Sequence, residues 1–89
     1  MKLKTLIEPI ISVTAGKRHV IAISDVSTMY AWGTNDFGQL AEDPNVTPVI
    51  IIPKRVKFFE GKNVVQAYAG DYSSAAVTKS NILYVWGQV

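Results

Sequence analysis

The sequence predicts an all-β fold, built of antiparallel strands in two copies of one repeat. Trp32-Gly33 recurs as Trp86-Gly87, and Ala15-Gly16 recurs as Ala69-Gly70, each pair 54 residues further along the chain. Within each copy, short runs of β-branched and aromatic residues alternate with Gly, Asn, Asp and Ser turns, a pattern that indicates strands. A period of about fifty residues with four short antiparallel strands is typical of a β-propeller blade. The 89 residues hold fewer than two such blades, so the predicted propeller is incomplete.

Composition excludes several classes of protein. The chain has 89 residues, of which 48% are hydrophobic and 18% are charged. This length allows one domain at most, and the low charged fraction suggests that apolar surface meets another molecule or another segment. Because there is no cysteine, disulfide scaffolds, thiolate nucleophiles and Cys-based zinc sites are excluded. A net charge of +2 does not predict a nucleic-acid partner.

Hydropathy predicts neither a membrane span nor a secretory signal. The longest aliphatic run covers residues 49–52, far short of the roughly 20 apolar residues that a membrane span needs. The basic start, Met1 to Lys4, resembles the beginning of a signal peptide, but Glu8 and Pro9 interrupt the apolar stretch that follows. We therefore expect an intracellular protein, cytoplasmic or nuclear.

The first strand of each copy is expected over residues 10–14 and 64–68. When residues 11–33 are laid over residues 65–87, six identities appear without a gap: Ala15, Gly16, Ala22, Tyr30, Trp32 and Gly33 match Ala69, Gly70, Ala76, Tyr84, Trp86 and Gly87. A tight turn follows each first strand at residues 15–18 and 69–72. Gly16 and Gly70 are expected there because glycine adopts positive φ without a Cβ clash.

The second strands, residues 19–24 and 73–78, are nearly unbroken runs of small and branched residues, which suggests burial on both faces. The third strands, residues 28–32 and 82–86, alternate instead. This alternation places Tyr30 and Trp32 on one face, and Tyr84 and Trp86 on the equivalent face.

The segment between the copies is less regular. Residues 34–47 form a polar loop, and residues 49–52, between Pro48 and Pro53, are either a short strand or an apolar plug. Residues 55–59 are expected to add an outer strand before residues 60–63 turn into the second copy.

Two longer strings allow a family to be recognised. Residues 13–19 (VTAGKRH) and 29–40 (MYAWGTNDFGQL) resemble the regulator of chromosome condensation repeat, and residues 64–71 and 83–87 resemble it again. On this resemblance, residues 1–9 lead into a first repeat, residues 10–63, and a truncated second repeat, residues 64–89. The resemblance implies a structural role for the repeat-signature residues Gly16, His19, Trp32, Gly33, Gly38, Gln39, Leu40, Gly70, Trp86 and Gly87.

The chain departs from the family pattern at three places. Ala41 stands where the family usually has another glycine, and Ser73 stands where the first copy has His19. The second copy reaches Val89 before any Gly-Gln-Leu. These departures weaken any polar role shared by both copies and leave the fold prediction unchanged.

The resemblance implies a seven-bladed propeller that serves mostly as a docking platform. We therefore expect a non-enzymatic interaction or scaffold module whose partners are proteins, including further blades or a large assembly. The alternative function is guanine-nucleotide exchange on a small GTPase, the activity of a known family member. No catalytic constellation is found in the sequence, and no cofactor or metal is expected. Because repeat units do not bury their faces alone, two blades should expose apolar side chains on both outer faces.

His19 and the two tryptophans each allow a chemical and a structural interpretation. His19 could act as a general base or metal ligand, but without cysteine or a second histidine a zinc site is not assembled in the usual way. A hydrogen bond from its ring to a neighbouring turn is the favoured interpretation. Trp32 and Trp86 could stack on sugars or bases, but their repetition favours packing.

The turns carry the candidate partner-facing residues. Lys17 and Arg18 could contact phosphates, but Asp71 and Tyr72 occupy the equivalent turn of the second copy, so no continuous basic stripe is expected. Loops on a rigid scaffold are the usual place for binding. The candidate set is Lys17, Arg18, Asp36, Asp71 and Tyr72.

Overall fold

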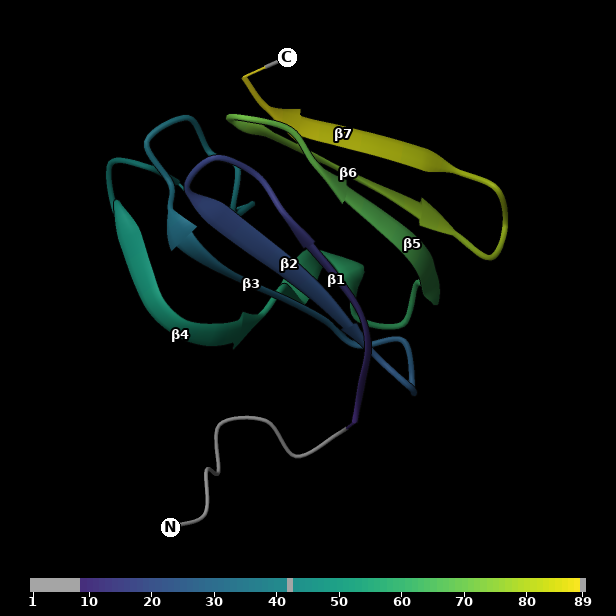
Figure 1. The fold of residues 1–89 in the computed structure, drawn as a ribbon. Coiled ribbons are helices and arrows are strands. Elements are labelled where there is room, and N and C mark those ends of the chain that lie inside the picture. The colour runs from purple at the N-terminus through teal and green to yellow at the C-terminus, as the bar shows by residue number, and fades with distance from the viewer. Residues whose placement is uncertain (1–8, 42, 89) are drawn as a thin grey trace, which may run out of the picture.

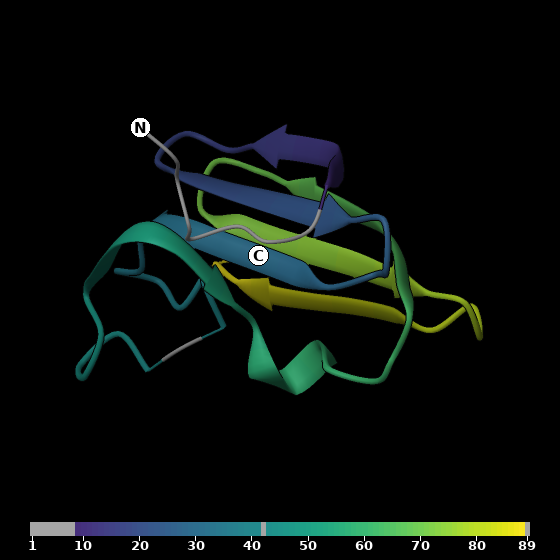
Figure 2. The same cartoon turned by 90° about the horizontal axis from the view of Figure 1, so that it is seen from below.

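The computed structural model describes residues 9–41 and 43–88 and folds into two antiparallel sheets (Figure 1). The first sheet has the order β1 (Ile10–Ala15), β2 (His19–Ser24), β3 (Met29–Thr34) and β4 (Val49–Arg55). The second has the order β5 (Val64–Ala69), β6 (Ser73–Thr78) and β7 (Leu83–Gly87). A 3₁₀ turn, η1 (Lys57–Phe59), lies on the connection from β4 to β5 (Figure 2). The all-β prediction is confirmed: among residues 9–41 and 43–88, the first sheet has four strands and the second has three, each arranged as in a propeller blade.

The sequence repeat is reproduced in the backbone geometry. Pairs of residues 54 positions apart share the same irregularities, namely a register shift after the first residue of the inner strand and left-handed φ at two positions. The register shifts between Ile10 and Ser12 in β1, and between Val64 and Gln66 in β5. The φ angle is 67° at both Ser27 and Asn81. It is also positive at both Gly33 (117°) and Gly87 (90°). The two copies are therefore one structural unit used twice.

The core lies between the two sheets. β2 and β3 supply Ile21, Ile23, Met29 and Ala31, and β5 and β6 supply Val64, Ala67 and Ala76, with Leu40, Val56 and Phe59 from the intervening segment. β2 is buried on nearly every residue, as expected for a strand covered on both faces. In β6, by contrast, buried and half-buried residues alternate: Ala76 belongs to the core, and Ala75 and Val77 point to the opposite face of the sheet.

The outer strand of the first blade differs from the expected one. It runs from Val49 to Arg55 and pairs with β3, whereas Lys57–Phe59 form η1 rather than a strand. Pro53 was expected to end the apolar run, but it lies inside β4. The pairing register shifts between Ala31 and Gly33, so Pro53 falls in an irregular stretch of an edge strand, where no ladder hydrogen bond from its nitrogen is required.

The role expected of the two turn glycines is also corrected. Gly16 and Gly70 are not among the residues with positive φ. A Cβ on Gly16 would instead collide with the carbonyl oxygen of Gly70 and with the ring of His19. Glycine is needed at position 16 because the two sheets approach each other closely, and the backbone conformation itself is ordinary.

Candidate functional site

His19 lies at the seam, the contact between the first and second sheets, and is 2% exposed. Its Nε2 is 3.0 Å from the carbonyl oxygen of Ser73 and 3.1 Å from Oγ of Ser74. Because a carbonyl only accepts, Nε2 carries the proton and donates it. The ring therefore bonds the start of β6 in the other repeat, and not its own turn.

The buried ring of His19 is held in the neutral form. Burial lowers the pKa of His19 below its ordinary value of 6.5, and the hydrogen bond to the Ser73 backbone opposes this in part. Nδ1 is buried and has no hydrogen-bond partner among the described residues. Protonation would thus place a charge in the seam without a second acceptor, which is unfavourable.

The Gly-Gln-Leu string forms a second polar contact across the seam. The main-chain carbonyl of Gln39 accepts hydrogen bonds from Ser74 Oγ at 2.6 Å and from the indole Nε1 of Trp86 at 3.0 Å. The Gln39 side chain is fully buried and accepts from the backbone N–H of Phe37 at 2.9 Å. Leu40 continues into the core. This turn of the first repeat is therefore a docking element for the second repeat.

Two further buried polar residues, Asn35 in the turn after β3 and Ser74 at the seam, are not singled out by the sequence pattern. The Asn35 side chain accepts from the N–H of Leu40 at 2.9 Å and donates to the carbonyl of Thr47 at 2.7 Å, which holds the turn in shape. Ser74 donates to Gln39. Asn35 lies inside the string that suggested the family, so it could have been found; Ser74 has no counterpart, because Val20 occupies its place in the first repeat.

The five predicted partner-facing residues, Lys17, Arg18, Asp36, Asp71 and Tyr72, lie in turns at one end of the sheets. Together with Phe37, which contacts Tyr72, they form a group we term the rim cluster. The backbone N–H of Lys17 donates to the carbonyl of Asp71, and its ammonium lies 5.8 Å from the ring centroid of Tyr72. The ring of Tyr72 meets that of Phe37 edge to face, with centroids 5.0 Å apart.

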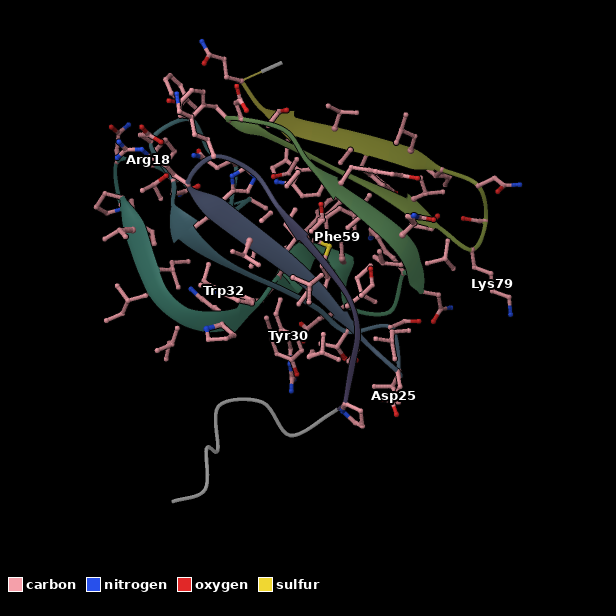
Figure 3. All side chains as sticks on the ribbon, in the orientation of Figure 1. Arg18, Asp25, Tyr30, Trp32, Phe59 and Lys79 are labelled. Carbon is pink, nitrogen blue, oxygen red and sulfur yellow. The ribbon has the colours of Figure 1, made fainter. Side chains whose placement is uncertain are left out.

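The rim cluster is electrically balanced and open to solvent. Its two cations and two carboxylates are all exposed, so it presents no continuous basic surface. Figure 3 shows Arg18 at this end of the sheets, and Asp25 and Lys79 on the two equivalent turns at the opposite end. The remaining signature residues serve the framework: Gly33 and Gly87 have positive φ and pack against the backbone of the preceding turns.

The two tryptophans differ although they occupy equivalent positions. Trp86 packs on the core at the seam. Trp32 is half-buried on the opposite face of its sheet, beside β4 (Figure 3). Within residues 9–41 and 43–88, no acceptor is found for its indole N–H.

A third surface is the face of the second sheet turned away from the seam, which we term the open face: Tyr68, Ser73, Ala75, Val77, Leu83 and Val85. Tyr68 is 51%, Leu83 60% and Val85 53% exposed. Shifted back by 54 residues, Leu83 and Val85 correspond to Met29 and Ala31, which are buried at the seam. Positions covered in the first repeat are therefore uncovered in the second.

The described part of the chain holds no group of three or more His, Cys, Asp or Glu side chains placed to bind a metal ion. None of its helical segments has the length and apolar character needed to cross a membrane.

Comparison with known proteins agrees with this geometry. Two models of the regulator of chromosome condensation (RCC1) repeat match residues 28–77 and residues 10–39. The chain is 33% identical over 82 residues to the mouse regulator of chromosome condensation, covering 92% of this chain and 19% of that protein. It is 34% identical to the ultraviolet-B receptor UVR8 of Arabidopsis thaliana, covering 98% and 20%. It is 33% identical to the mouse secretion-regulating guanine nucleotide exchange factor, covering 97% and 20%. The chain thus spans about a fifth of the length of these relatives.

Solved structures give the same result for the fold. Human WBSCR16 superposes with a TM-score of 0.73 at 27% identity, and Prp20p of Saccharomyces cerevisiae, described with its binding to Gsp1p and histones, with 0.72 at 32% identity. In both cases the match covers 88% of this chain and 19% of the other. With the repeat, the seam and these matches in agreement, the chain belongs to the regulator of chromosome condensation (RCC1) repeat family.

Proposed function

We propose that this chain is a non-enzymatic interaction module: a propeller segment that docks protein partners, foremost further blades of the same repeat type. The observation that carries the proposal is the open face. Leu83 and Val85 are exposed where their equivalents Met29 and Ala31 are buried by a neighbouring repeat. The second repeat covers this surface of the first repeat. The equivalent surface of the second repeat, the open face, is therefore suited to packing against a further repeat.

The free energy gained by burying apolar side chains supports docking at the open face. Fully burying an exposed Leu or Val side chain contributes about 1.5–3 kcal/mol. Three large side chains of this face, Tyr68, Leu83 and Val85, are about half exposed or more. Their burial against one partner would therefore give a substantial driving force before any hydrogen bond is formed.

In the same proposal, the rim cluster selects partners of balanced charge. The backbone N–H of Lys17 donates to the Asp71 carbonyl, its ammonium lies over the Tyr72 ring, and the rings of Phe37 and Tyr72 meet edge to face. Electrostatic complementarity of this kind contributes mainly to specificity and association rate.

The proposal is tested by placing a charge on the open face. Leu83→Lys should abolish recovery of protein partners from a native extract, whereas Val46→Lys should not, because Val46 is 77% exposed in the loop between β3 and β4. Circular dichroism of both variants establishes that the sheets are retained. Equal partner recovery by both variants would overturn the assignment of the open face.

A second candidate is guanine-nucleotide exchange on a small GTPase. It is favoured by the similarity to the secretion-regulating guanine nucleotide exchange factor. A wedge against a nucleotide pocket would have to come from the loops, and the rim cluster with exposed Phe37 offers one. Release of a fluorescent guanine nucleotide from a panel of small GTPases is the test, with Phe37→Ala as the variant. If the chain leaves the release rate unchanged, this candidate is removed.

A further inference from the structure

A cavity of about 290 Å³ lies between the β2–β3 turn and the connection from β4 to β5. One wall consists of residues 26–29, and the other comes from within residues 55–63. Both walls belong to the first repeat, and they are separate from the open face and from the rim cluster. Cavities that hold small molecules usually measure about 300–1,000 Å³. This cavity is at the lower limit and therefore suits a ligand of about the size of an amino acid.

The floor of the cavity is apolar. Met29, Val56 and Phe59 line it and are 2%, 5% and 3% exposed. All three belong to the core between the sheets, and close packing there fixes their side chains. The N–H of Val56 donates to the carbonyl of Met29 at 2.9 Å, so a main-chain hydrogen bond joins the two walls. The floor is therefore a preformed surface for an apolar group.

Two opposite charges lie at the mouth of the cavity. The Nη1 atom of Arg55 is 3.7 Å from Oε2 of Glu60, and the two side chains are 49% and 50% exposed. This separation is too long for a hydrogen bond, and an ion pair so exposed to solvent contributes little to stability. Both groups therefore keep hydrogen-bonding capacity for a ligand.

The two charges together define the class of ligand. An anion would be attracted by Arg55 and repelled by Glu60, and for a cation the two effects are exchanged. A zwitterion complements both groups, because its carboxylate accepts from the guanidinium while its ammonium donates to the Glu60 carboxylate. The apolar floor adds a preference for a zwitterion that carries an aliphatic substituent.

We propose that this cavity binds a free α-amino acid with a branched aliphatic side chain. Arg55 and Glu60 hold the carboxylate and the ammonium group at the mouth, and the side chain rests on the floor formed by Met29, Val56 and Phe59. The site goes beyond the proposed function, because it takes a small molecule on the first repeat, whereas the open face takes a protein on the second.

The test is a titration of the isotope-labelled 89-residue chain with L-leucine, followed by NMR. The amide resonances of Met29, Val56 and Glu60 should shift and saturate. Isocaproate lacks the ammonium group and isoamylamine lacks the carboxylate, so each should bind at least about tenfold more weakly, since each loses one charge-assisted hydrogen bond. Equal binding of the three compounds, or shifts that do not saturate, would overturn the site.

Variants at the mouth separate charge recognition from non-specific binding. Arg55→Met and Glu60→Gln each remove one charge and should weaken L-leucine binding by about tenfold or more. In Arg55→Met the preference for L-leucine over isoamylamine should also disappear, because both compounds then offer only an ammonium group to Glu60. The matched control is Lys57→Met, since Lys57 is exposed and does not line the cavity; this variant should bind like the wild type.

The same loss of binding in all three variants would contradict recognition by the two charges. Should Arg55→Met lose its sheets in circular dichroism, Glu60→Gln decides, because its preference for L-leucine over isocaproate should disappear. The partner recovery tested with Leu83→Lys does not involve this cavity, so the two proposals fail separately.

Discussion

His19 joins the two repeats through a neutral ring, so its titration is coupled to the stability of the seam. The pKa of the folded state is lowered by burial, and the unfolded chain therefore takes up a proton first as the pH falls. Stability follows the difference in bound protons between the two states. The contribution of neutral His19 to the free energy of unfolding is fully present above the ordinary pKa of 6.5. It declines as the pH falls towards the lower pKa of His19 in the folded state.

We expect the free energy of unfolding to decrease between about pH 7.5 and about pH 5.5, the range in which histidine titrates. In His19→Gln, which keeps a donor but does not titrate, the difference from wild type should shrink as the pH falls. Urea unfolding at several pH values measures both proteins. Parallel pH profiles for wild type and variant would show that His19 is not the responsible group.

Ala41 is a residue in a conformation that suits glycine. Its φ is 63°, in the left-handed region, and it stands where the family pattern usually has another glycine. An L-residue there costs roughly 1–2 kcal/mol, of which the greater entropy of glycine in the unfolded chain offsets a part.

Ala41→Gly should therefore stabilise the chain by about 0.5–1 kcal/mol. The matched control is Ala15→Gly, since Ala15 is also exposed, lies at the end of β1 and has ordinary φ; this variant should be destabilised by about 0.5–1 kcal/mol. If backbone conformation causes these effects, chemical denaturation should show changes of opposite sign in the free energy of unfolding of the two variants. The same sign in both would refute this account.

At the scale of elements, the seam depends on a turn from one sheet and side chains from the other. The Gln39 carbonyl is shared by Ser74 and Trp86, so β6 and β7 are both anchored to the loop that follows β3. These bonds connect residues far apart in sequence and end on a backbone atom, which no side-chain pattern reveals.

The two tryptophans provide an internal comparison for the seam. Trp86→Phe removes the indole donor to Gln39 and should cost about 1–2 kcal/mol, since it leaves a buried acceptor with one partner fewer. Trp32→Phe should cost clearly less, because Trp32 has no such acceptor in the described part of the chain. Thermal unfolding of both variants is the measurement. A larger loss for Trp32→Phe would contradict the assignment of the seam bonds.

Most of the strands could be predicted from the pattern of residue types. The sequence predicts strands at residues 19–24 and 73–78, where the structure has β2 and β6, because Gly and Ser turns bound these apolar runs. The outer strand was not, because two prolines beside residues 49–52 obscured a strand that tolerates Pro53 at an edge. In the candidate site, the turns of the rim cluster could be predicted from the sequence repeat. The hydrogen-bond partners of His19 could not, because they depend on the tertiary contact between the two sheets.

At the scale of the whole molecule, two blades already pack like a small globular domain. The radius of gyration is 12.2 Å, close to the roughly 12 Å expected of a compact chain of this length. Compactness comes from a single seam, while Leu83 and Val85 of the open face are exposed. The molecule therefore has a buried core at the seam and an exposed apolar face on its second sheet.

Completing the second blade should raise its stability. Position 89 corresponds to position 35 by the repeat, so residues 36–56 appended after Val89 would supply a fourth strand for β7. The extended chain should unfold at a higher temperature, by about 4–8 °C for each kcal/mol gained. An appendix of identical composition in reversed order is the control, and an equal midpoint for both chains would contradict the expected pairing.

The hydrogen bond from His19 to Ser73 spans 54 positions, which has a consequence for biosynthesis. Chains are made at about 5–20 residues per second, so roughly 3–11 seconds pass between the addition of His19 and that of its acceptor. Throughout that interval Ile21 and Met29, almost fully buried in the finished fold, lack their cover. The first blade is therefore synthesised before the sheet that covers its apolar face, and that face lacks its cover until β5 and β6 have been made.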